Sequence, residues 1–325
     1  MSAFEDSVID RLSGVLDQVE KIRVQALADQ KRAMSICVII GVIAGALGLL
    51  LTVVAKSVFV LFFSVIVGGA ICYFTYHSIC GDSVRKFRYA YKTRLVAGIA
   101  KVLQPEMEFH PYKGISEDLF KSCGHYTTGI DRYATEDVFE GNIGATKLFF
   151  GELHAEYKTT STDSKGRKST TWHTIFQGVL LVADFHKHFQ TWVTVRPDNE
   201  RDGFFGWIGQ KIQGLNNSLV KMESPEFEKH FRVNAGDATG AMYILTPDMQ
   251  ERLLALRSSL GSGIIVSFQK SSICITAPKE KDWFEADIAV SAVSRDQIRR
   301  LASQMQHYFR IVETLNLNMR IWTKE

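Results

Sequence analysis

Two stretches of this 325-residue chain contain no aspartate, glutamate, lysine or arginine at all. They are residues 35–54 and 57–80, with a short turn at Lys56 between them. At a rise of about 1.5 Å per residue, some 20 helical residues cross the roughly 30 Å hydrocarbon layer of a bilayer. Each stretch is long enough for this, so the sequence predicts a hairpin of two transmembrane helices within residues 35–80.

The length and position of the first uncharged stretch argue against a signal peptide. The apolar core of a signal peptide is about 7–15 residues long and lies close to the N-terminus. Here 34 residues, many of them charged, precede the first uncharged stretch. A buried helix of a soluble protein is the other alternative, but two uncharged runs separated by so short a turn disfavour it.

Excess charge and cysteine are also scarce. A formal net charge of +3 in 325 residues is too small to indicate a nucleic-acid partner. Of five cysteines, Cys37, Cys72 and Cys80 belong to the uncharged stretches or their edge, which leaves Cys123 and Cys274. Two cysteines are no disulfide framework, and they fit a reducing compartment.

Cationic residues flank the uncharged stretches unevenly. The turn between the stretches offers only Lys56, whereas Lys31 and Arg32 precede the first, and five cationic residues follow the second: Arg85, Lys86, Arg88, Lys92 and Arg94. Cationic residues stay on the cytoplasmic side of a membrane. We therefore expect both termini and the soluble part of the chain to be cytoplasmic, with the turn facing outward.

Apolar residues recur at helical spacing on both sides of the hairpin. In the segment 1–34 the series steps by 3, 4, 3 and 4, as in a coiled-coil seam: Leu12, Val15, Val19, Ile22 and Ala26. A similar stripe runs through residues 81–104: Val84, Phe87, Tyr91, Leu95, Gly98 and Val102. The two helices are antiparallel neighbours as they leave the hairpin, which predicts a two-helix stalk. Pairing of the N-terminal helix with another copy of the chain is the alternative.

Residues 105–325 read as one cytoplasmic α+β domain with an antiparallel sheet. Strands are predicted at 146–158, 171–185, 190–196, 239–245, 264–269 and 272–277, after a connector at 105–135. Helices are predicted at 204–215, 225–230 and 247–259, the last with Thr246 as N-cap before Pro247. A capping box at Ser294–Gln297 opens a final long helix. The strand–hairpin–helix order favours antiparallel over doubly wound parallel sheet.

The alternation of apolar and polar side chains in the first predicted hairpin indicates how its two strands pair. If Glu156 pairs with His173, then Leu153 lies opposite Phe176 and the apolar side chains share one face. The polar side chains, His154 among them, then line the other face. A one-residue slip would mix the two sets, so the pattern favours this register.

Several sequence blocks together resemble a known family. The blocks begin at Glu152-Leu153-His154-Ala155-Glu156-Tyr157 and continue through Trp172-His173-Thr174-Ile175-Phe176, Ala183-Asp184-Phe185, Pro225-Glu226-Phe227-Glu228, Ile244-Leu245-Thr246-Pro247 and Leu315-Asn316-Leu317-Asn318. This series is similar to the bacterial membrane-protein family catalogued as domain of unknown function 3137, over most of residues 105–325. The resemblance implies a protein of the bacterial cytoplasmic (inner) membrane. It carries over no catalytic residue and no cofactor.

The polar face of the first hairpin holds the sharpest chemical candidate. In the proposed register His154, Glu156 and His173 cluster, and two imidazoles with one carboxylate are ligands for zinc or non-haem iron. The alternative is a solvated sheet face with an ordinary Glu–His cross-strand pair. The motif Cys123-Gly124-His125 is better explained as a helix stop than as a nucleophile and its base. Phosphate-binding glycine loops are absent from the sequence.

Two membrane-related features remain open. Residues 203–209, with Phe204, Phe205 and Trp207, are either an interfacial anchor or one face of a helix packed on the sheet. Gly41 and Gly45 form a G-x-x-x-G that permits close helix contact. The sequence thus predicts a membrane-tethered cytoplasmic scaffold or sensor module that binds a protein partner or the membrane surface, or forms a homo-oligomer. The alternative is a metal-dependent enzyme that uses His154, Glu156 and His173.

Overall fold

A computed structural model describes residues 2–185, 189–198, 219–279 and 284–317. The chain divides into two compact units. We call Met1–Val102 with Phe284–Ala302 the helix unit, and Leu103–Trp283 with Ser303–Glu325 the sheet unit. Helix α9 (Arg295–Phe309) begins in the first unit and ends in the second.

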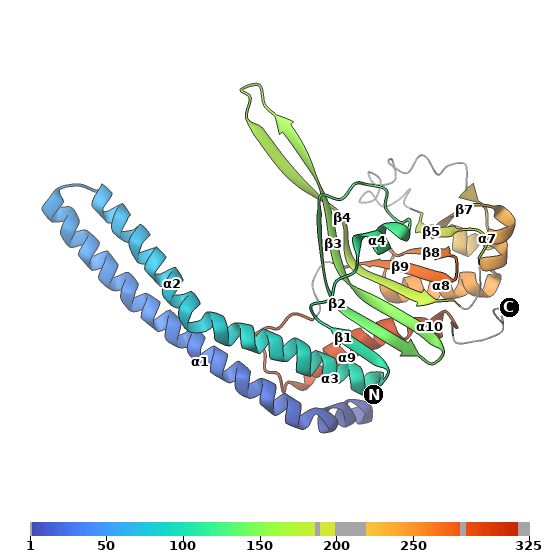
Figure 1. The fold of residues 1–325 in the computed structure, drawn as a ribbon, viewed down its shortest axis with the longest axis horizontal. Helices are drawn as coiled ribbons and strands as arrows, with labels where there is room; N and C mark the ends of the chain where they lie inside the picture. The colour runs from blue at the N-terminus through green and yellow to red at the C-terminus, as the bar shows by residue number, and fades with distance from the viewer. Residues whose placement is uncertain (1, 186–188, 199–218, 280–283, 318–325) are drawn as a thin grey trace. The chain divides into compact units, whose positions relative to one another are not determined.

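The helix unit is built on two long helices that lie side by side (Figure 1). α1 runs without a break over Ser2–Ala55, and α2 covers Phe59–Ala90. Lys56 turns the chain between them with a φ of 51°. Beyond α2 the helix widens into a π-helical segment, η1 (Tyr91–Val96), and then narrows again into α3 (Ala97–Leu103). The predicted N-terminal helix and first uncharged stretch are therefore one continuous helix.

Small residues let α1 and α2 approach closely in their uncharged parts. A Cβ added at Gly68 would lie 2.8 Å from Ala44 Cβ, and one at Gly48 would collide with Ser64. At the other end of the helices, Leu12, Val19 and Ala26 of the N-terminal stripe are buried. A Cβ on Gly98 of α3 would lie 3.0 Å from Leu12 Cδ2, so this stripe packs within the same chain.

A segment from far along the sequence, residues 284–302, packs in the helix unit; we call it the return segment. Glu20 of α1 accepts the Ala292 N–H at 2.8 Å, and Arg23 donates to the Ile288 carbonyl at 2.8 Å. Lys92 of η1 forms a 2.7 Å ion pair with Glu285. No sequence pattern indicated this association.

A Tyr91–Gln297 hydrogen bond of 2.7 Å adds a second contact from η1 to the return segment. Because the π turn inserts one residue into the helix, it moves Tyr91 and Lys92 out of the register that an α-helix would give them. Both residues are buried there.

The sheet unit contains, among its described residues, nine antiparallel strands in the order β1-β2-β3-β4-β9-β8-β5-β7-β6. The strands are Met107–His110, Arg132–Ile143, Thr146–Thr162, Lys168–Asp184, Val193–Pro197, Leu219–Val220, Phe231–Ala235, Ile265–Gln269 and Ser272–Pro278, for β1 to β9. The predicted α+β class with an antiparallel sheet is therefore confirmed.

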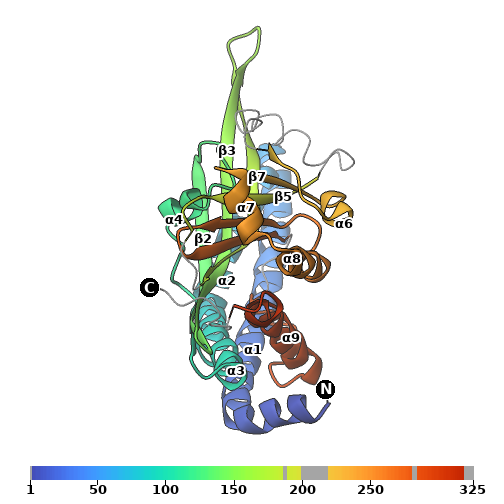
Figure 2. The ribbon, with the colours of Figure 1, turned by 90° about the vertical axis from the view of Figure 1, so that its right-hand side faces the viewer.

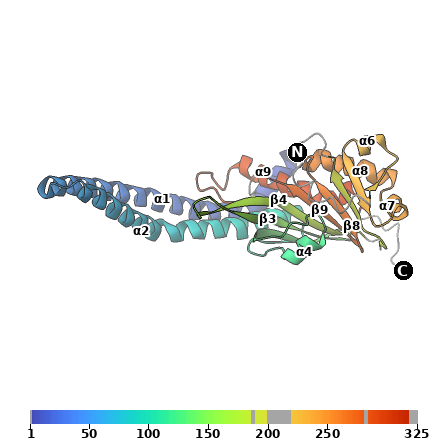
Figure 3. The same cartoon turned by 90° about the horizontal axis from the view of Figure 1, so that it is seen from above.

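Helices cover both faces of this sheet. α4 (Glu117–Ser122) and α8 (Pro247–Leu260) lie on opposite sides of it (Figures 2 and 3). Under α4, the Phe120 ring stacks 5.9 Å from that of Phe176. On the other face, Phe150 stacks 5.1 Å from Tyr308 of α9. The remaining helices are α6 (Pro225–Glu228), α7 (Ala238–Ile244) and α10 (Ile311–Thr314).

Several element predictions are confirmed and one is wrong. The helix predicted at 247–259 is α8, with Thr246 accepting the Met249 N–H at 3.3 Å as its N-cap. The hairpin 264–277 is β8–β9. The strand predicted at 239–245 is instead helix α7, because Asp237 caps it by accepting the Gly240 N–H. The helix predicted at 204–215 and the segment 203–209 both lie outside the described residues.

The proposed register of the first hairpin is also wrong. Glu156 lies opposite Thr174, and Tyr157 lies opposite His173. Two local features cause the shift. Asp163 closes a five-residue tip by binding the N–H groups of Lys165 and Arg167, and a β-bulge follows between Ala155 and Glu156.

Gly178 provides a test of how tightly β4 meets β9. A Cβ there would collide with the Ala277 carbonyl oxygen and lie 2.9 Å from Pro278 Cα. We expect Gly178→Ala to lower the free energy of unfolding by about 2–3 kcal/mol, because backbone atoms would have to move apart. Gly129→Ala is the control, since nothing lies within 4 Å of its Cβ position. Thermal unfolding of both variants measures the difference, and equal midpoints would contradict the packing described.

Candidate functional site

Exposed apolar side chains form a belt on both long helices. The belt covers the uncharged parts of α1 and α2, and its members are Met34, Val38, Ile39, Val42, Ile43, Leu47, Leu49, Leu50, Leu51, Val53, Val54, Val58, Phe59, Phe62, Phe63, Val65, Ile66, Val67, Ile71, Tyr73 and Phe74. Soluble monomers rarely expose contiguous apolar patches larger than a few hundred Å². An exposed apolar surface of this extent is typical of a site that contacts a membrane or a protein partner.

Both helices of the belt are long and apolar enough to cross a membrane. Among the described residues, two helical stretches qualify, Val8–Ala55 and Phe59–Leu103, with mean hydropathies of 2.8 and 2.0 in their most apolar windows. Only 6% of each window is buried inside the protein, which distinguishes both from the core helices of a soluble domain. This supports membrane association by length, composition and exposure.

Gly41 and Gly45 do not take part in the contact between α1 and α2. Nothing lies within 4 Å of a Cβ at either position, whereas Gly48 and Gly68 carry the close approach. The G-x-x-x-G read from the sequence is therefore not what brings the two helices of one chain together.

The three predicted metal ligands sit on the first hairpin but not on one face. His154 and Glu156 share a face of β3, with His154 Nε2 3.9 Å from Glu156 Oε1. His173 lies directly opposite Tyr157 and stacks on its ring at 4.9 Å, which places it on the other face. The corrected register separates His173 from the other two residues.

Each of these side chains also contacts neighbours other than the proposed ligands. Glu156 Oε2 accepts a 3.0 Å hydrogen bond from Arg132, and His173 Nε2 lies 2.9 Å from the Thr159 hydroxyl. The Arg132 guanidinium also lies over the Trp172 ring, 3.8 Å from its centroid. These contacts are those of a structured hairpin surface, and metal binding stays a prediction.

An open pocket of about 430 Å³ lies beside His154, on the same face of β3; we call it the β2–β4 pocket. Its charged centre is a buried ion pair, with Lys279 Nζ 2.6 Å from Glu152 Oε1. The two side chains are only 8% and 9% exposed. The lining residues are Pro111, Tyr112, Ala134, Thr135, Glu136, Glu152, Leu153, His154, Gln177, Gly178 and Lys279.

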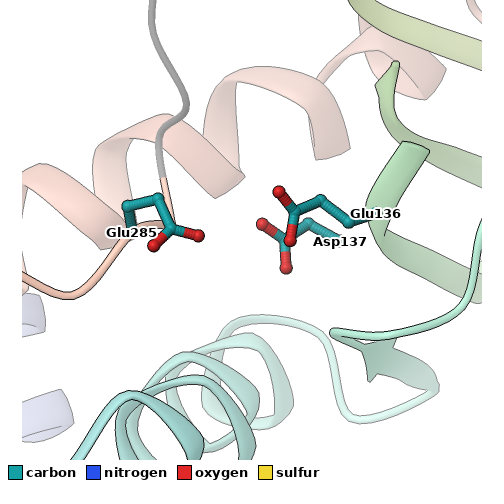
Figure 4. A group of neighbouring side chains, drawn as sticks. All are labelled: Glu136, Asp137 and Glu285. Atoms are coloured by element: carbon teal, nitrogen blue, oxygen red, sulfur yellow. The ribbon is translucent and has the colours of Figure 1, made fainter. Parts of the chain in front are cut away.

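A bulge in β2 places Glu136 in this pocket. The β2–β3 register shifts between Glu136 and Phe139, and Asp137 adopts a φ of 57° there. Figure 4 shows the carboxylates of Glu136 and Asp137 beside β2. Glu285, also drawn there, belongs to the helix unit.

The Cys123–His125 loop is bound into the sheet and does not form a catalytic pair. The His125 ring is fully buried, with Nδ1 2.9 Å from the Thr276 hydroxyl and Nε2 2.9 Å from the Ser267 hydroxyl. Ser267 in turn donates to the Cys123 carbonyl at 2.9 Å. Both ring nitrogens are thus occupied by hydroxyl groups, in agreement with the structural interpretation of this motif.

Arg196 of β5 completes the attachment of this loop. Its guanidinium donates to the carbonyl oxygens of His125, at 2.7 Å, and Gly124, at 2.9 Å. Burial, and in second place the Arg196 charge, lowers the pKa of His125 to about 3. The histidine is therefore neutral in the folded protein at physiological pH.

Sequence reasoning missed Lys279 and Arg196. Neither belongs to a recognisable motif, and both become important because distant strands bring them to Glu152 and to the Cys123–His125 loop. The only local indication of such a role was a cationic residue in or beside a largely apolar strand.

The family resemblance read from the sequence blocks is confirmed for one part of the chain. Residues 174–317 match the model of a protein family of unknown function, DUF3137. No curated protein sequence matches the chain. Among solved structures, the crystal structure of the mycobacterial trehalose monomycolate transport factor A, TtfA, is similar with a TM-score of 0.32 and 11% identity. The match covers 68% of this chain and 97% of that chain, and at this TM-score it carries no functional argument.

The buried His125 predicts a pH dependence of stability. An unfolded histidine titrates near pH 6.5, whereas the folded one stays neutral down to about pH 3. Between these values the unfolded state binds more protons, so the free energy of unfolding falls as the pH is lowered, by up to about 1.4 kcal/mol per pH unit. We expect His125→Asn to reduce the slope of unfolding free energy against pH between about 6.5 and 5. An unchanged slope would contradict the buried neutral histidine.

Metal content tests the predicted ligands directly. If the predicted ligands hold a metal, elemental analysis of the purified chain finds a transition metal whose content falls when a ligand is removed. The geometry gives a sharper expectation: His154→Ala, on the Glu156 face, should then reduce the content more than His173→Ala does. A wild-type chain purified without chelators that contains no transition metal removes the hypothesis.

Proposed function

We propose that this protein is a membrane-tethered, non-enzymatic scaffold or sensor module. The observation that carries the proposal is the apolar belt on α1 and α2, which is exposed on both helices. Immersing the belt in lipid hydrocarbon removes it from water, at roughly 25 cal/mol per Å² of apolar surface. The backbone N–H and C=O groups of both spans are satisfied within the helices, as a bilayer requires.

Charge at the ends of the belt supports a hairpin with both ends on the same side. Lys31, Arg32 and the basic residues of α2 after Asp82 lie at one end, and Lys56 alone lies at the turn. The positive-inside rule then puts the turn outside and the sheet unit in the cytoplasm. With the family resemblance, the location we propose is the bacterial cytoplasmic membrane.

The return segment supports a role in which the helices act as more than an anchor. Arg23 and Lys92 are buried where they bind this segment. Buried charges that lose their partner are strongly destabilising, so the segment is held in one defined position. A defined link between the helices and a C-terminal part of the chain suits a scaffold or sensor, whereas a passive anchor does not require it.

The tip of the first hairpin is the surface we propose for a protein partner. Residues 157–173, which we call the hairpin arm, extend past the last pairing of β2, at Arg132 and Glu156 (Figure 1). There β3 and β4 pair only with each other among the described strands. A two-stranded ribbon is marginally stable by itself, and its two open edges offer backbone hydrogen bonds to an added strand.

Labelling in spheroplasts tests the proposed topology. We expect Lys56→Cys, in the turn, to react with a membrane-impermeant maleimide in intact spheroplasts. Ser164→Cys, at the exposed tip of the hairpin arm, should react only after lysis. The reason is that the bilayer separates the turn from the sheet unit.

The wild-type chain is the control for the five native cysteines, whose side chains are buried or half-buried. Reaction of both variants before lysis, or of Ser164→Cys alone, would contradict the topology. A wild-type chain that is washed from membranes at alkaline pH would contradict the membrane anchor itself.

A further inference from the structure

Exposed cationic side chains lie on both long helices just beyond one end of the apolar belt; we call them the basic collar. Its members are Lys31 and Arg32 of α1 and Arg85, Lys86 and Arg88 of α2, all of them exposed. The Asp29 carboxylate accepts a hydrogen bond from the Ser83 hydroxyl, two residues before the collar on each helix. This bond places the α1 and α2 parts of the collar side by side, within the helix unit.

Most collar side chains are available to a ligand. Arg85 pairs with Asp82. Within the described part of the chain, no hydrogen bond or ion pair holds the other four side chains, which are those of Lys31, Arg32, Lys86 and Arg88. An anion can therefore bind these four groups without breaking a contact inside the protein.

The collar concentrates the positive charge of the chain. Residues 26–34 and 80–89 contain five cations and two carboxylates, a formal charge of +3 that equals the charge of the whole chain. Both carboxylates are already engaged, Asp29 with Ser83 and Asp82 with Arg85. Between the two uncharged stretches, the other end of the belt carries Lys56 alone. Positive charge at one end of the hairpin attracts an anionic surface to that end.

The position of the collar matches the depth of lipid headgroups. Headgroups add about 5–8 Å to each side of the roughly 30 Å hydrocarbon layer. Lys31 and Arg32 lie four and three residues before the first uncharged stretch, and Arg85 and Lys86 lie five and six residues after the second. At 1.5 Å per residue these offsets are about 5–9 Å. Long cationic side chains can also extend back toward the membrane from positions farther out, such as Arg88.

We propose that the basic collar binds the headgroup of an anionic phospholipid through Lys31, Arg32, Lys86 and Arg88. Guanidinium groups bind phosphate oxygens through paired hydrogen bonds, and ammonium groups act on them as point charges. Beside an anionic membrane surface, each lysine or arginine contributes about fivefold in affinity. The inference rests on the membrane tether proposed above and goes beyond it, because it names the class of lipid that the hairpin selects.

Native mass spectrometry of the full-length chain in micelles of a neutral detergent tests the proposal, because it counts the lipids bound to each chain. The probes are phosphatidylglycerol and phosphatidylcholine with identical acyl chains, and inorganic phosphate. We expect phosphatidylglycerol to bind at least about fivefold more tightly than phosphatidylcholine. Inorganic phosphate at the same concentration should not displace it. Micelles leave both ends of the hairpin open to added lipid, so the orientation of the chain in a bilayer does not affect the result.

Two double variants remove charge from the collar. Lys31→Gln combined with Lys86→Gln should weaken phosphatidylglycerol binding about fivefold or more and phosphatidylcholine binding less. Arg32→Gln combined with Arg88→Gln should do the same, and it reports on the collar even if the first variant does not fold. The matched control is Lys165→Gln combined with Lys168→Gln, which removes two exposed lysines of the hairpin arm. It should leave both affinities unchanged.

Three results would overturn the proposal. Equal affinity for the two lipids would contradict it and favour an acidic protein partner for the collar. Displacement of phosphatidylglycerol by inorganic phosphate would identify a free anion as the ligand in place of a lipid. Equal weakening by the collar variants and the hairpin-arm control would mean that charge in general, and not the collar, determines the preference.

The collar and the membrane tether fail separately. The expected labelling pattern in spheroplasts together with equal lipid affinities would keep the tether and overturn the collar. A phosphatidylglycerol preference that the collar variants lose, together with a reversed labelling pattern, would keep the collar and overturn the topology.

Discussion

The apolar belt on α1 and α2 imposes the strictest physical condition on this protein. Its side chains are large, contiguous and exposed on both helices, and the contact between the helices hides few of them. Because burying apolar surface is the main favourable term in protein association, the belt has to be covered. The bilayer proposed above would cover it without any other partner, and the short turn at Lys56 joins the two helices that carry the belt.

Outside the belt, the long helices are held by contacts with other parts of the same chain. The α1 stripe packs against α3 within the same chain. The return segment adds polar contacts, among them the Lys92–Glu285 ion pair. Glu20 and Arg23 of α1 pair with each other and also bind backbone groups of this segment. The Arg23 hydrogen bond holds the pKa of Glu20 below its usual range, so this carboxylate stays ionised beside the return segment.

Local sequence patterns predicted the elements that are determined by residues close together in the chain. Three predictions of this kind match the structure: the two uncharged helices, the helix that begins at Thr246–Pro247, and the β8–β9 hairpin. Each was predicted from residues within the element itself. The fold class followed from the order of such elements, and the family resemblance followed from a series of short sequence blocks.

Features that depend on distant contacts or on irregular backbone could not be predicted from the sequence. The first hairpin was misaligned because its register depends on the Asp163 tip and on a bulge that leaves Ile175 unpaired. The error put His173 on the face of Glu156, although it lies against Tyr157. The Lys279–Glu152 pair joins residues 127 positions apart, and no periodicity announces it.

Depth-dependent accessibility of spin labels tests the membrane tether most directly. Labels at Val42, Leu50 and Phe62, all exposed in the belt, are compared with one at Arg11, outside it, in the full-length chain reconstituted into lipid bilayers. The account predicts that the three belt labels relax readily with apolar oxygen and weakly with a polar nickel complex, whereas the Arg11 label does the opposite. Equal access of the nickel complex to all four positions would contradict it.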